Sequence, residues 1–129
     1  MTDKTLQVLV VDDVPINVKL LTTLLRAHGF TVESADSAET ALPMLGTGRF
    51  GLLLLDLRLP GMDGLTLARE LRTRELHADL IIVAVTANAM KRDQEAALAA
   101  GCDAFVSKPI NTRTLVPMLT SMLARGRTP

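Results

Sequence analysis

The sequence predicts an α/β fold in which a five-stranded parallel sheet carries helices on both faces. Short runs of β-favouring residues alternate with longer segments of helical periodicity, five of each. Two of the runs, Leu52–Leu55 and Leu80–Val85, show no polar alternation, as expected of strands buried on both faces. The 129 residues suffice for one domain but not for two.

The five strands are predicted from the apolar runs. They cover residues 6–11, 30–34, 51–55, 80–85 and 103–106. Because parallel neighbours need long crossover connections, each segment between two strands is expected to hold a helix.

The first helix follows the first strand. Pro15 suits its first turn, Gly29 suits its end, and His28 is placed to interact with the negative end of the helix dipole. An apolar stripe is predicted to pack on the sheet, formed by Ile16, Leu20, Leu21, Leu24 and Leu25.

The second helix has a start signal and an internal fault. Asp36 can cap it, and Glu39 can reach back to complete a capping box. Pro43 falls inside the helical segment, where proline removes a hydrogen-bond donor. We therefore expect a kink or an early end there.

The third helix follows Asp63-Gly64 and has a clear apolar stripe. The residues predicted to be buried are Leu65, Leu67, Ala68 and Leu71. Nearby arginines are predicted to form a solvated face, at positions 69, 72 and 74. His77 is predicted to face solvent in the polar loop that follows.

The fourth and fifth helices differ in apolar content. The fourth, from about Asn88 to Ala100, contains mostly alanines, so its packing should be weak. The fifth follows Asn111 as its N-cap and contains Pro117 as an internal fault. Its apolar stripe consists of Leu115, Met118, Leu119, Met122 and Leu123.

The composition argues against several classes of partner. Lys plus Arg and Asp plus Glu number 14 each, so the net charge gives no long-range attraction to nucleic acid or to a membrane surface. Three Phe are the only aromatic residues, too few for stacking on bases. No signal-peptide pattern or membrane-length apolar stretch is present, so we expect a cytoplasmic protein. Cys102 stands alone and fits a reducing compartment.

Three acidic residues stand at the ends of predicted strands. Asp56 follows the run 51–55, just as Asp12 and Asp13 follow the run 8–11. If these strands are neighbours, their carboxyl ends face the edge where open α/β sheets bind ligands. Crowded carboxylates resist joint ionisation unless a cation neutralises them. Oxygen ligands favour Mg²⁺, which keeps several waters and leaves room for a phosphate.

Two further polar residues are predicted at the same edge. Thr86 ends the fourth strand, and Lys108 follows the fifth. A hydroxyl and an ammonium opposite a metal are suitable partners for the oxygens of a phosphoryl group, whose transfer depends on positioning and charge neutralisation. The strand ends together therefore predict a phosphate-sized site.

These motifs resemble those of the receiver domains of two-component response regulators. The resemblance covers residues 6–124 and rests on Val11-Asp12-Asp13, the segment 56–64, Thr86-Ala87 and Lys108-Pro109, in this order. It implies a flavodoxin-like, doubly wound (βα)5 fold with strand order 2-1-3-4-5. We expect a receiver (phosphoacceptor) domain over residues 4–124 and a flexible C-terminal tail over 125–129. Single-domain regulators and the receivers of hybrid kinases are the most similar members.

The resemblance implies a metal-dependent phosphoacceptor. Asp56 would accept a phosphoryl group from a histidine kinase or a histidine phosphotransfer protein, and the domain would catalyse only its own phosphorylation and dephosphorylation. Together with Asp56, Asp13 would bind Mg²⁺ directly and Asp12 largely through water. The backbone carbonyl of Arg58 would be a further ligand, and Mn²⁺ could replace Mg²⁺. Arg58 and Asn88 would flank the attacking water and tune the lifetime of the phosphate.

Other residues would hold the phosphate and respond to it. Thr86 and Lys108 would bind phosphoryl oxygens, and the bond from Lys108 to Pro109 would be cis. Gly64 would permit the turn into the third helix. Thr86 would move toward the phosphate, and Phe105 would rotate into the vacated space. The face formed by the fourth helix, fifth strand and fifth helix (α4-β5-α5) would then control a downstream protein, with the chain a monomer or a weak phosphorylation-dependent dimer.

Other interpretations are open at this point. A phosphatase with an aspartate nucleophile would want a second carboxylate two residues after Asp56, where Arg58 stands. A nucleotide or flavin binder would have a glycine-rich turn after the first strand, where the chain has Asp12-Asp13-Val14-Pro15. The chain could also be a receiver-like scaffold, or the excised receiver of a larger hybrid kinase.

Overall fold

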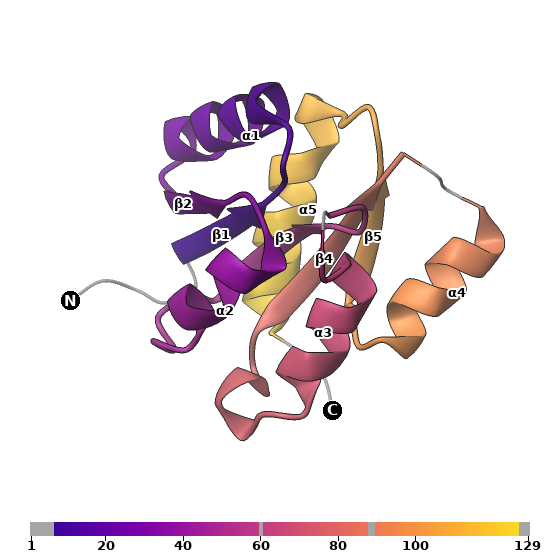
Figure 1. Cartoon of the computed structure of the whole chain (residues 1–129). Coiled ribbons are helices and arrows are strands. Elements are labelled where there is room, and N and C mark those ends of the chain that lie inside the picture. Colours follow the sequence, from indigo (N-terminus) through magenta and orange to yellow (C-terminus); the bar gives the residue numbers. More distant parts are fainter. Residues whose placement is uncertain (1–6, 60, 88–89, 127–129) are drawn as a thin grey trace.

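The computed structural model describes residues 7–59, 61–87 and 90–126. Strands and helices alternate along the chain, as the sequence predicted (Figure 1). All five predicted strands are present, and β2 to β5 each begin and end one residue later than predicted. The strands are β1 (Gln7–Val11), β2 (Thr31–Ala35), β3 (Leu52–Asp56), β4 (Ile81–Thr86) and β5 (Ala104–Ser107).

All five strands belong to one parallel sheet in the order β2-β1-β3-β4-β5, which confirms the predicted order. In this register Val11 lies opposite Leu55, and Asp56 lies opposite Val85. The carboxyl ends of β1, β3, β4 and β5 therefore meet at one edge of the sheet.

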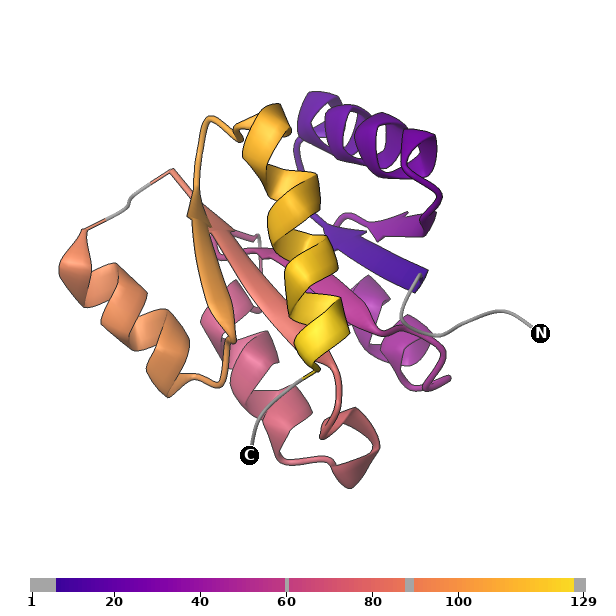
Figure 2. The same cartoon turned by 180° about the vertical axis from the view of Figure 1, so that it is seen from behind.

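Helices cover both faces of the sheet (Figures 1 and 2). One face carries α1 (Pro15–Ala27) and α5 (Thr112–Arg125). The other carries α2 (Ala38–Leu45), α3 (Gly64–Arg72) and α4 (Lys91–Ala99). A 3₁₀ turn, η2 (Glu75–His77), follows α3.

The strands divide their side chains between two aliphatic cores. Val8 and Val10 of β1 pack with α1 and α5, whereas Leu9 and Val11 pack on the opposite side. This is the alternation that a strand imposes when both faces of its sheet are covered.

Three of the five residues in the predicted apolar stripe of α1, Leu21, Leu24 and Leu25, pack against the sheet. Leu21 and Leu25 are buried, but Ile16 is 75% exposed and Leu20 is 43% exposed. At about 100° per residue, Ile16 and Leu25 lie on opposite sides of the helix. The five apolar residues span too much of the circumference to be buried together, so the prediction was wrong for Ile16 and Leu20.

The second helix begins with a different cap from the one predicted. The side chain of Ser37, not Asp36, accepts a hydrogen bond at the start of α2, from the backbone N–H of Thr40 (3.1 Å). Glu39 forms no capping box, and its carboxylate contacts the loop before α3 instead. The helix contains Pro43 as an internal residue and ends two residues later at Leu45, so the early end expected at the proline does not occur there.

The third helix follows its prediction closely. The Asp63 side chain caps it by accepting from the backbone N–H of Thr66 (2.8 Å). Leu67, Ala68 and Leu71 are buried, and Leu65 is partly buried against the same core.

The fourth helix is shorter than predicted and weakly packed. It begins at Lys91, and the predicted start at Asn88 lies outside the described residues. Ala97 is its only buried residue among those described, while Met90 and Leu98 are 56% and 55% exposed. The predicted weak packing is therefore confirmed.

The fifth helix is continuous. Asn111 caps it as predicted, accepting from the backbone N–H of Arg113 (3.0 Å). The helix runs through Pro117 to Arg125, so the first residue of the predicted tail is helical. Proline costs one hydrogen bond, and packing of the buried side chains on the sheet outweighs that loss.

Two predictions for the end of α3 were wrong. Arg72 does not lie on a solvated face, because its guanidinium donates to the carbonyls of Gly101 and His77 (2.9 Å each) and to the carboxylate of Asp103 (2.8 Å). His77 is buried rather than solvent-facing. Cys102, next to this cluster, is buried, and burial raises the pKa of its thiol to about 11.

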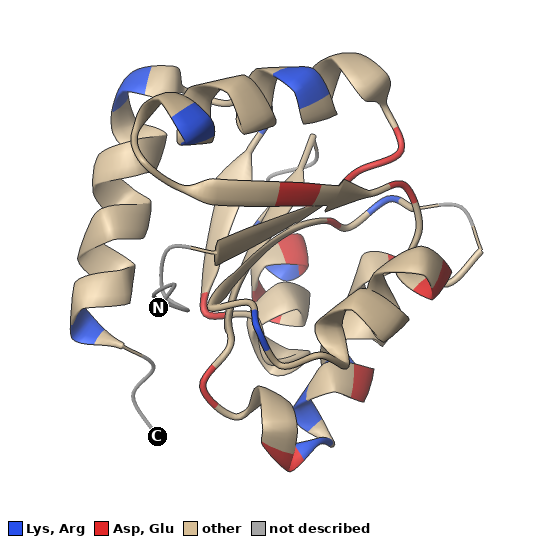
Figure 3. Ribbon diagram, turned by 90° about the vertical axis from the view of Figure 1, so that its left-hand side faces the viewer, with Lys and Arg blue, Asp and Glu red and all other residues tan. Residues whose placement is uncertain are grey.

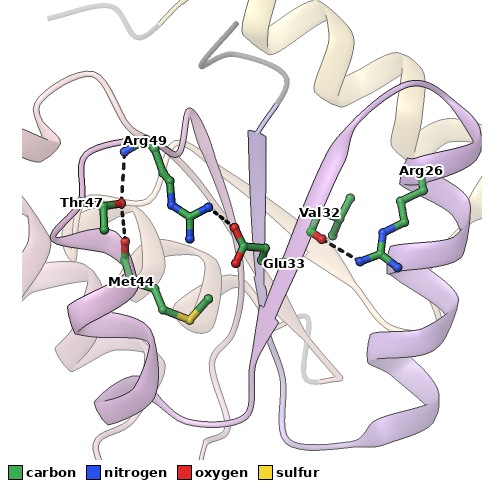
Figure 4. Close-up of polar contacts among 6 residues, drawn as sticks. All are labelled: Arg26, Val32, Glu33, Met44, Thr47 and Arg49. Carbon is green, nitrogen blue, oxygen red and sulfur yellow. Dashed lines mark hydrogen bonds and ion pairs between the residues drawn. The ribbon is translucent and has the colours of Figure 1, made fainter. Parts of the chain in front are cut away.

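Two arginines from neighbouring segments contact β2, one at a backbone carbonyl and one at a side chain (Figure 4). Arg26 of α1 donates to the carbonyl of Val32 (2.8 Å), and Arg49 pairs with Glu33. The Ala35 carbonyl faces β1, where it accepts from the N–H of Asp12. Since carbonyls alternate in direction along a strand, that of Val32 faces away from β1.

Charges of both signs are interspersed over loops and helices (Figure 3). None of the described helices has the length and apolar character needed to span a membrane.

Candidate functional site

Three carboxylates meet at the carboxyl edge of the sheet. Asp56 is the last residue of β3, and Asp12 and Asp13 directly follow β1, its neighbour in the sheet. One ligand oxygen of each residue lies within 4.8 Å of the others. Asp12 and Asp56 are only 3% and 4% exposed, whereas Asp13 is open to solvent. The structure thus brings together the three acids that the sequence singled out.

Backbone N–H groups orient the two buried carboxylates. Oδ1 of Asp56 accepts from the N–H of Arg58, and Oδ1 of Asp12 accepts from the N–H of Val14, both at 2.9 Å. Each aspartate uses one oxygen to bond the chain two residues ahead, as an aspartate in a turn commonly does. The second oxygen of each residue is thereby directed toward the site.

Lys108 reaches these second oxygens. Its Nζ lies 3.0 Å from Oδ2 of Asp56 and 3.5 Å from Oδ2 of Asp12. The backbone N–H of Lys108 donates to the carbonyl of Thr86 (2.8 Å), which ties the segment after β5 to the end of β4. The peptide bond between Lys108 and Pro109 is cis, as the family resemblance implied.

The electrostatics of the cluster are unbalanced. Burial raises the pKa of Asp56, and the nearby charge of Asp12 acts in the same direction; the bonds from Arg58 and Lys108 only partly offset them. Burial alone would lower the pKa of Lys108, but its bond to Asp56 and the charges of Asp56 and Asp12 raise it above its ordinary value. Three carboxylates face one ammonium, so the cluster carries a net charge that one divalent cation would cancel.

The donor set of the cluster fits magnesium. The ligand atoms are carboxylate oxygens from three residues, and one of these residues, Asp13, remains accessible from solvent. Mg²⁺ prefers oxygen ligands, binds through few carboxylates and keeps part of its hydration shell. The cluster could therefore hold Mg²⁺ with room left for a second ligand.

The two residues predicted to respond to phosphate lie on the neighbouring strands. Thr86 is buried and ends β4, one residue beyond Val85, which is the partner of Asp56 in the sheet. Phe105 of β5 lies opposite Ala84 and is partly buried against the core on the side of α2 to α4. Their positions agree with the predicted arrangement, and their movement stays a prediction.

Gly64 allows a close approach rather than an unusual turn. A Cβ atom at this position would lie 2.6 Å from the carbonyl oxygen of Asp56 and 2.7 Å from Cα of Leu57. Gly64 is not among the glycines with positive φ. The start of α3 therefore packs directly against the backbone that carries Asp56, and a larger residue would push that backbone away.

Sequence reasoning missed the two N–H groups that orient the aspartates. A backbone N–H is present at every residue except proline, so the sequence does not show which ones will donate. An aspartate at a turn does commonly bond the backbone N–H two residues ahead, and that pattern could have predicted both bonds. Of the predicted tuning residues, Arg58 lies beside Asp56, and Asn88 lies outside the described residues.

Relatives of this chain include sensor proteins much longer than it is. It is 41% identical over 121 residues to the aerobic respiration control sensor protein ArcB of Escherichia coli. That match covers 93% of the chain but only 15% of ArcB.

Solved structures show the same architecture. The receiver domain of the sensor histidine kinase PA1611 of Pseudomonas aeruginosa, with a magnesium ion coordinated in its active-site cleft, matches with a TM-score of 0.84 and 31% identity over 92% of this chain and 97% of that one. A co-crystal structure of the Saccharomyces cerevisiae histidine phosphotransfer protein Ypd1 with the receiver domain of its downstream response regulator Ssk1 matches with a TM-score of 0.81 and 31% identity. It covers 88% of this chain and 86% of that one.

A protein-family model also matches most of the chain. The model for the response regulator receiver domain matches residues 8–120, which include every site residue discussed above. The fold, the strand order and the acidic edge agree with that match. The chain belongs to the family of response regulator receiver domains.

Proposed function

We propose that the chain is a phosphorylation-controlled signalling module that accepts a phosphoryl group on Asp56. The observation that carries this proposal is the contact between the buried Asp56 carboxylate and Lys108, at an edge that also holds Asp12 and Asp13. A carboxylate fixed beside a cation is suited to accept an anionic group.

The phosphoryl transfer is a substitution at phosphorus. A carboxylate oxygen of Asp56 forms the new P–O bond, the P–N bond of a phosphohistidine donor breaks, and its electron pair stays on the imidazole nitrogen. Lys108 is placed to transfer its hydrogen bond from Asp56 to a phosphoryl oxygen, and the Thr86 hydroxyl would bind another. Asp13, Asp56 and the carbonyl of Arg58 would hold Mg²⁺ directly and Asp12 largely through water, and the ion would supply charge neutralisation.

Loss of the phosphate follows the same axis. Water attacks the phosphorus, the P–O bond to Asp56 breaks, and the carboxylate returns with release of inorganic phosphate. Arg58 stands where a phosphatase with an aspartate nucleophile would need a second carboxylate. This favours a domain that modifies only itself over an enzyme that turns over an external substrate.

The output would be a change in protein binding. α4 has little buried surface, with Met90 and Leu98 exposed, and a weakly packed helix of this kind can take two positions of similar energy. A movement of Thr86 and Phe105 would bias those positions and alter the face formed by α4, β5 and α5. A downstream protein would bind that face, with the chain a monomer or a weak phosphorylation-dependent dimer.

The donor would be a histidine kinase or a histidine phosphotransfer protein in the cytoplasm. The Ypd1–Ssk1 complex supports the second class, since its receiver matches this chain. The match to the receiver domain of the sensor histidine kinase PA1611 supports the alternative that the chain is the receiver of a hybrid kinase. A phosphotransfer survey against the histidine kinases and phosphotransfer proteins of the source organism would identify the donor.

Labelling with acetyl phosphate tests the assignment of Asp56. Intact-mass measurement should show one added phosphoryl group that requires Mg²⁺ and is lost in Asp56→Asn. Asp36→Asn is the matched control, because Asp36 is an exposed aspartate that follows β2 at the same sheet edge. Persistence of the label in Asp56→Asn would refute the assignment. Sustained hydrolysis of a free phosphomonoester would favour the phosphatase instead.

A further inference from the structure

Glu39 contacts the loop that joins β3 to α3. Its Oε2 atom accepts a hydrogen bond from the backbone N–H of Met62 at 3.2 Å. A Cβ atom on Gly61 would lie only 2.8 Å from the same oxygen, so the carboxylate also packs against that glycine. Gly61 has φ of +72°, a conformation that favours glycine. A side chain of α2 thus fits the loop at two consecutive residues.

The same loop carries Arg58, whose carbonyl is the expected backbone ligand of the metal. At the start of the loop, the N–H of Arg58 donates to the carboxylate of Asp56. The two ends of the loop are joined by a hydrogen bond from the N–H of Gly64 to the carbonyl of Leu57 (3.2 Å). These ties lie at the base of the loop. The contact from Glu39 holds the far side, three to four residues beyond Arg58.

We propose that Glu39 is a positioning residue for the metal site, acting through the β3–α3 loop. A loop held at both its base and its far side samples fewer conformations before the ion binds. Less conformational entropy is then lost when the carbonyl of Arg58 becomes a ligand. This inference rests on the proposed function, since it requires that the acidic edge binds Mg²⁺.

Two substitutions of Glu39 distinguish the effect of its hydrogen bond from the effect of its charge. A bond from an N–H to a carboxylate is stronger than one to a neutral oxygen, but Gln keeps an acceptor at the same distance from the backbone. Glu39→Gln removes the charge and keeps the bond, whereas Glu39→Ala removes both. Glu75→Ala is a control for the loss of an exposed carboxylate elsewhere on the surface.

The test is a calorimetric titration of the unphosphorylated protein with MgCl2. Glu39→Ala should raise Kd for Mg²⁺ about three- to tenfold. This is less than the loss of affinity expected when a residue that hydrogen-bonds a metal ligand directly is removed. Glu39→Gln should stay within about twofold of the parent, and Glu75→Ala should equal it. Exchange of the Met62 amide, followed by NMR, should accelerate in Glu39→Ala and remain slow in Glu39→Gln. Gly61→Ala disturbs the same contact from the loop side and should also raise Kd.

Different results would contradict the positioning role of Glu39 and the binding of Mg²⁺ at the acidic edge. If the parent binds Mg²⁺ and Glu39→Ala binds it equally well while its Met62 amide exchanges freely, the positioning role is overturned. If Glu39→Gln weakens binding as much as Glu39→Ala with Met62 still protected, through-space charge is the cause, and the inference again fails. If the parent binds no Mg²⁺, the metal-dependent function itself fails. Should Glu39→Ala not fold, Gly61→Ala and Glu39→Gln still decide the question.

Discussion

The two ends of the sheet each hold a partly buried cluster of charges, and the clusters are satisfied in different ways. At the amino end, Arg72 bonds two carbonyls and Asp103, and Asp103 also accepts from the N–H of Ile82 (2.9 Å). At the carboxyl end, three carboxylates face Lys108 alone among the described residues. The first cluster is balanced by the chain itself, and the second is left with excess negative charge.

The difference indicates which end stabilises the fold and which end binds a ligand. Arg72 ties the end of α3 to η2 and to the loop between α4 and β5, over a sequence distance of about 30 residues. Asp12, Asp13 and Asp56 instead repel one another, and burial raises the pKa of Asp56. Electrostatic strain at the carboxyl end is the condition under which an added cation is bound tightly.

The largest effect on stability is expected at the amino end. Arg72→Met should lower the free energy of unfolding by about 3 kcal/mol, because it leaves the Asp103 carboxylate without its cation and removes one hydrogen-bond donor from each of the carbonyls of Gly101 and His77. Urea unfolding followed by circular dichroism measures this. A loss under about 1 kcal/mol would show that the amino-end cluster does not stabilise the fold.

A slightly smaller effect is expected from magnesium at the carboxyl end. MgCl2 at 100 times Kd should raise the free energy of unfolding by about 2.7 kcal/mol through mass action. The gain should be mostly lost in Asp13→Asn and kept in Arg72→Met, because the two clusters lie at opposite ends of the sheet. Thermal unfolding in MgCl2, compared with NaCl of equal ionic strength, checks it. Equal stabilisation of Asp13→Asn would mean that the ion binds elsewhere.

Neutralising Asp56 should stabilise the metal-free protein. We expect Asp56→Asn to raise the free energy of unfolding by about 1 kcal/mol at neutral pH. The raised pKa of Asp56 means that the folded protein holds this proton more tightly than the unfolded chain. The stabilisation that this proton gives the parent is therefore lost as the pH rises from the ordinary pKa of an aspartate through the raised pKa of Asp56. The advantage of Asp56→Asn should grow across that window in paired urea titrations; a constant difference would contradict the assigned shift.

The smallest effect is expected from an exposed pair on the same helix end as Arg72. Arg74 bonds Glu70 at 3.1 Å, and both side chains are largely exposed. Arg74→Met should change the free energy of unfolding by no more than about 0.5 kcal/mol. Measured beside Arg72→Met, it separates the cost of losing a partly buried arginine from that of losing any arginine near α3.

Patterns of local sequence predicted the strands and the residues that end them, and the family resemblance supplied the order of the strands in the sheet. Apolar runs mark strands, and in a parallel sheet a residue that ends a strand must lie at the carboxyl edge. Asp56 and Lys108 were therefore predicted to meet although they are 52 residues apart. This inference needed the strand order, which came from the family resemblance and not from periodicity.

What the sequence could not predict depended on contacts between distant segments. Nothing near Arg72 shows that Gly101 and Asp103 will lie beside it, so a solvated helix face was the natural expectation. Periodicity likewise cannot say which half of a wide stripe is buried, and Ile16 was misplaced for that reason. Ser37 and Asp36 are both good caps, and only the backbone path decided between them.

The hydrogen bond from Arg26 to Val32 bears on how the protein behaves at high concentration. β2 is an outer strand, and its outward carbonyls and N–H groups are a template on which another chain could add a strand. A guanidinium already bonded to one of those carbonyls, with the bulk of α1 behind it, obstructs such growth. The β2 edge therefore offers a second chain one free carbonyl fewer than an uncovered edge strand would.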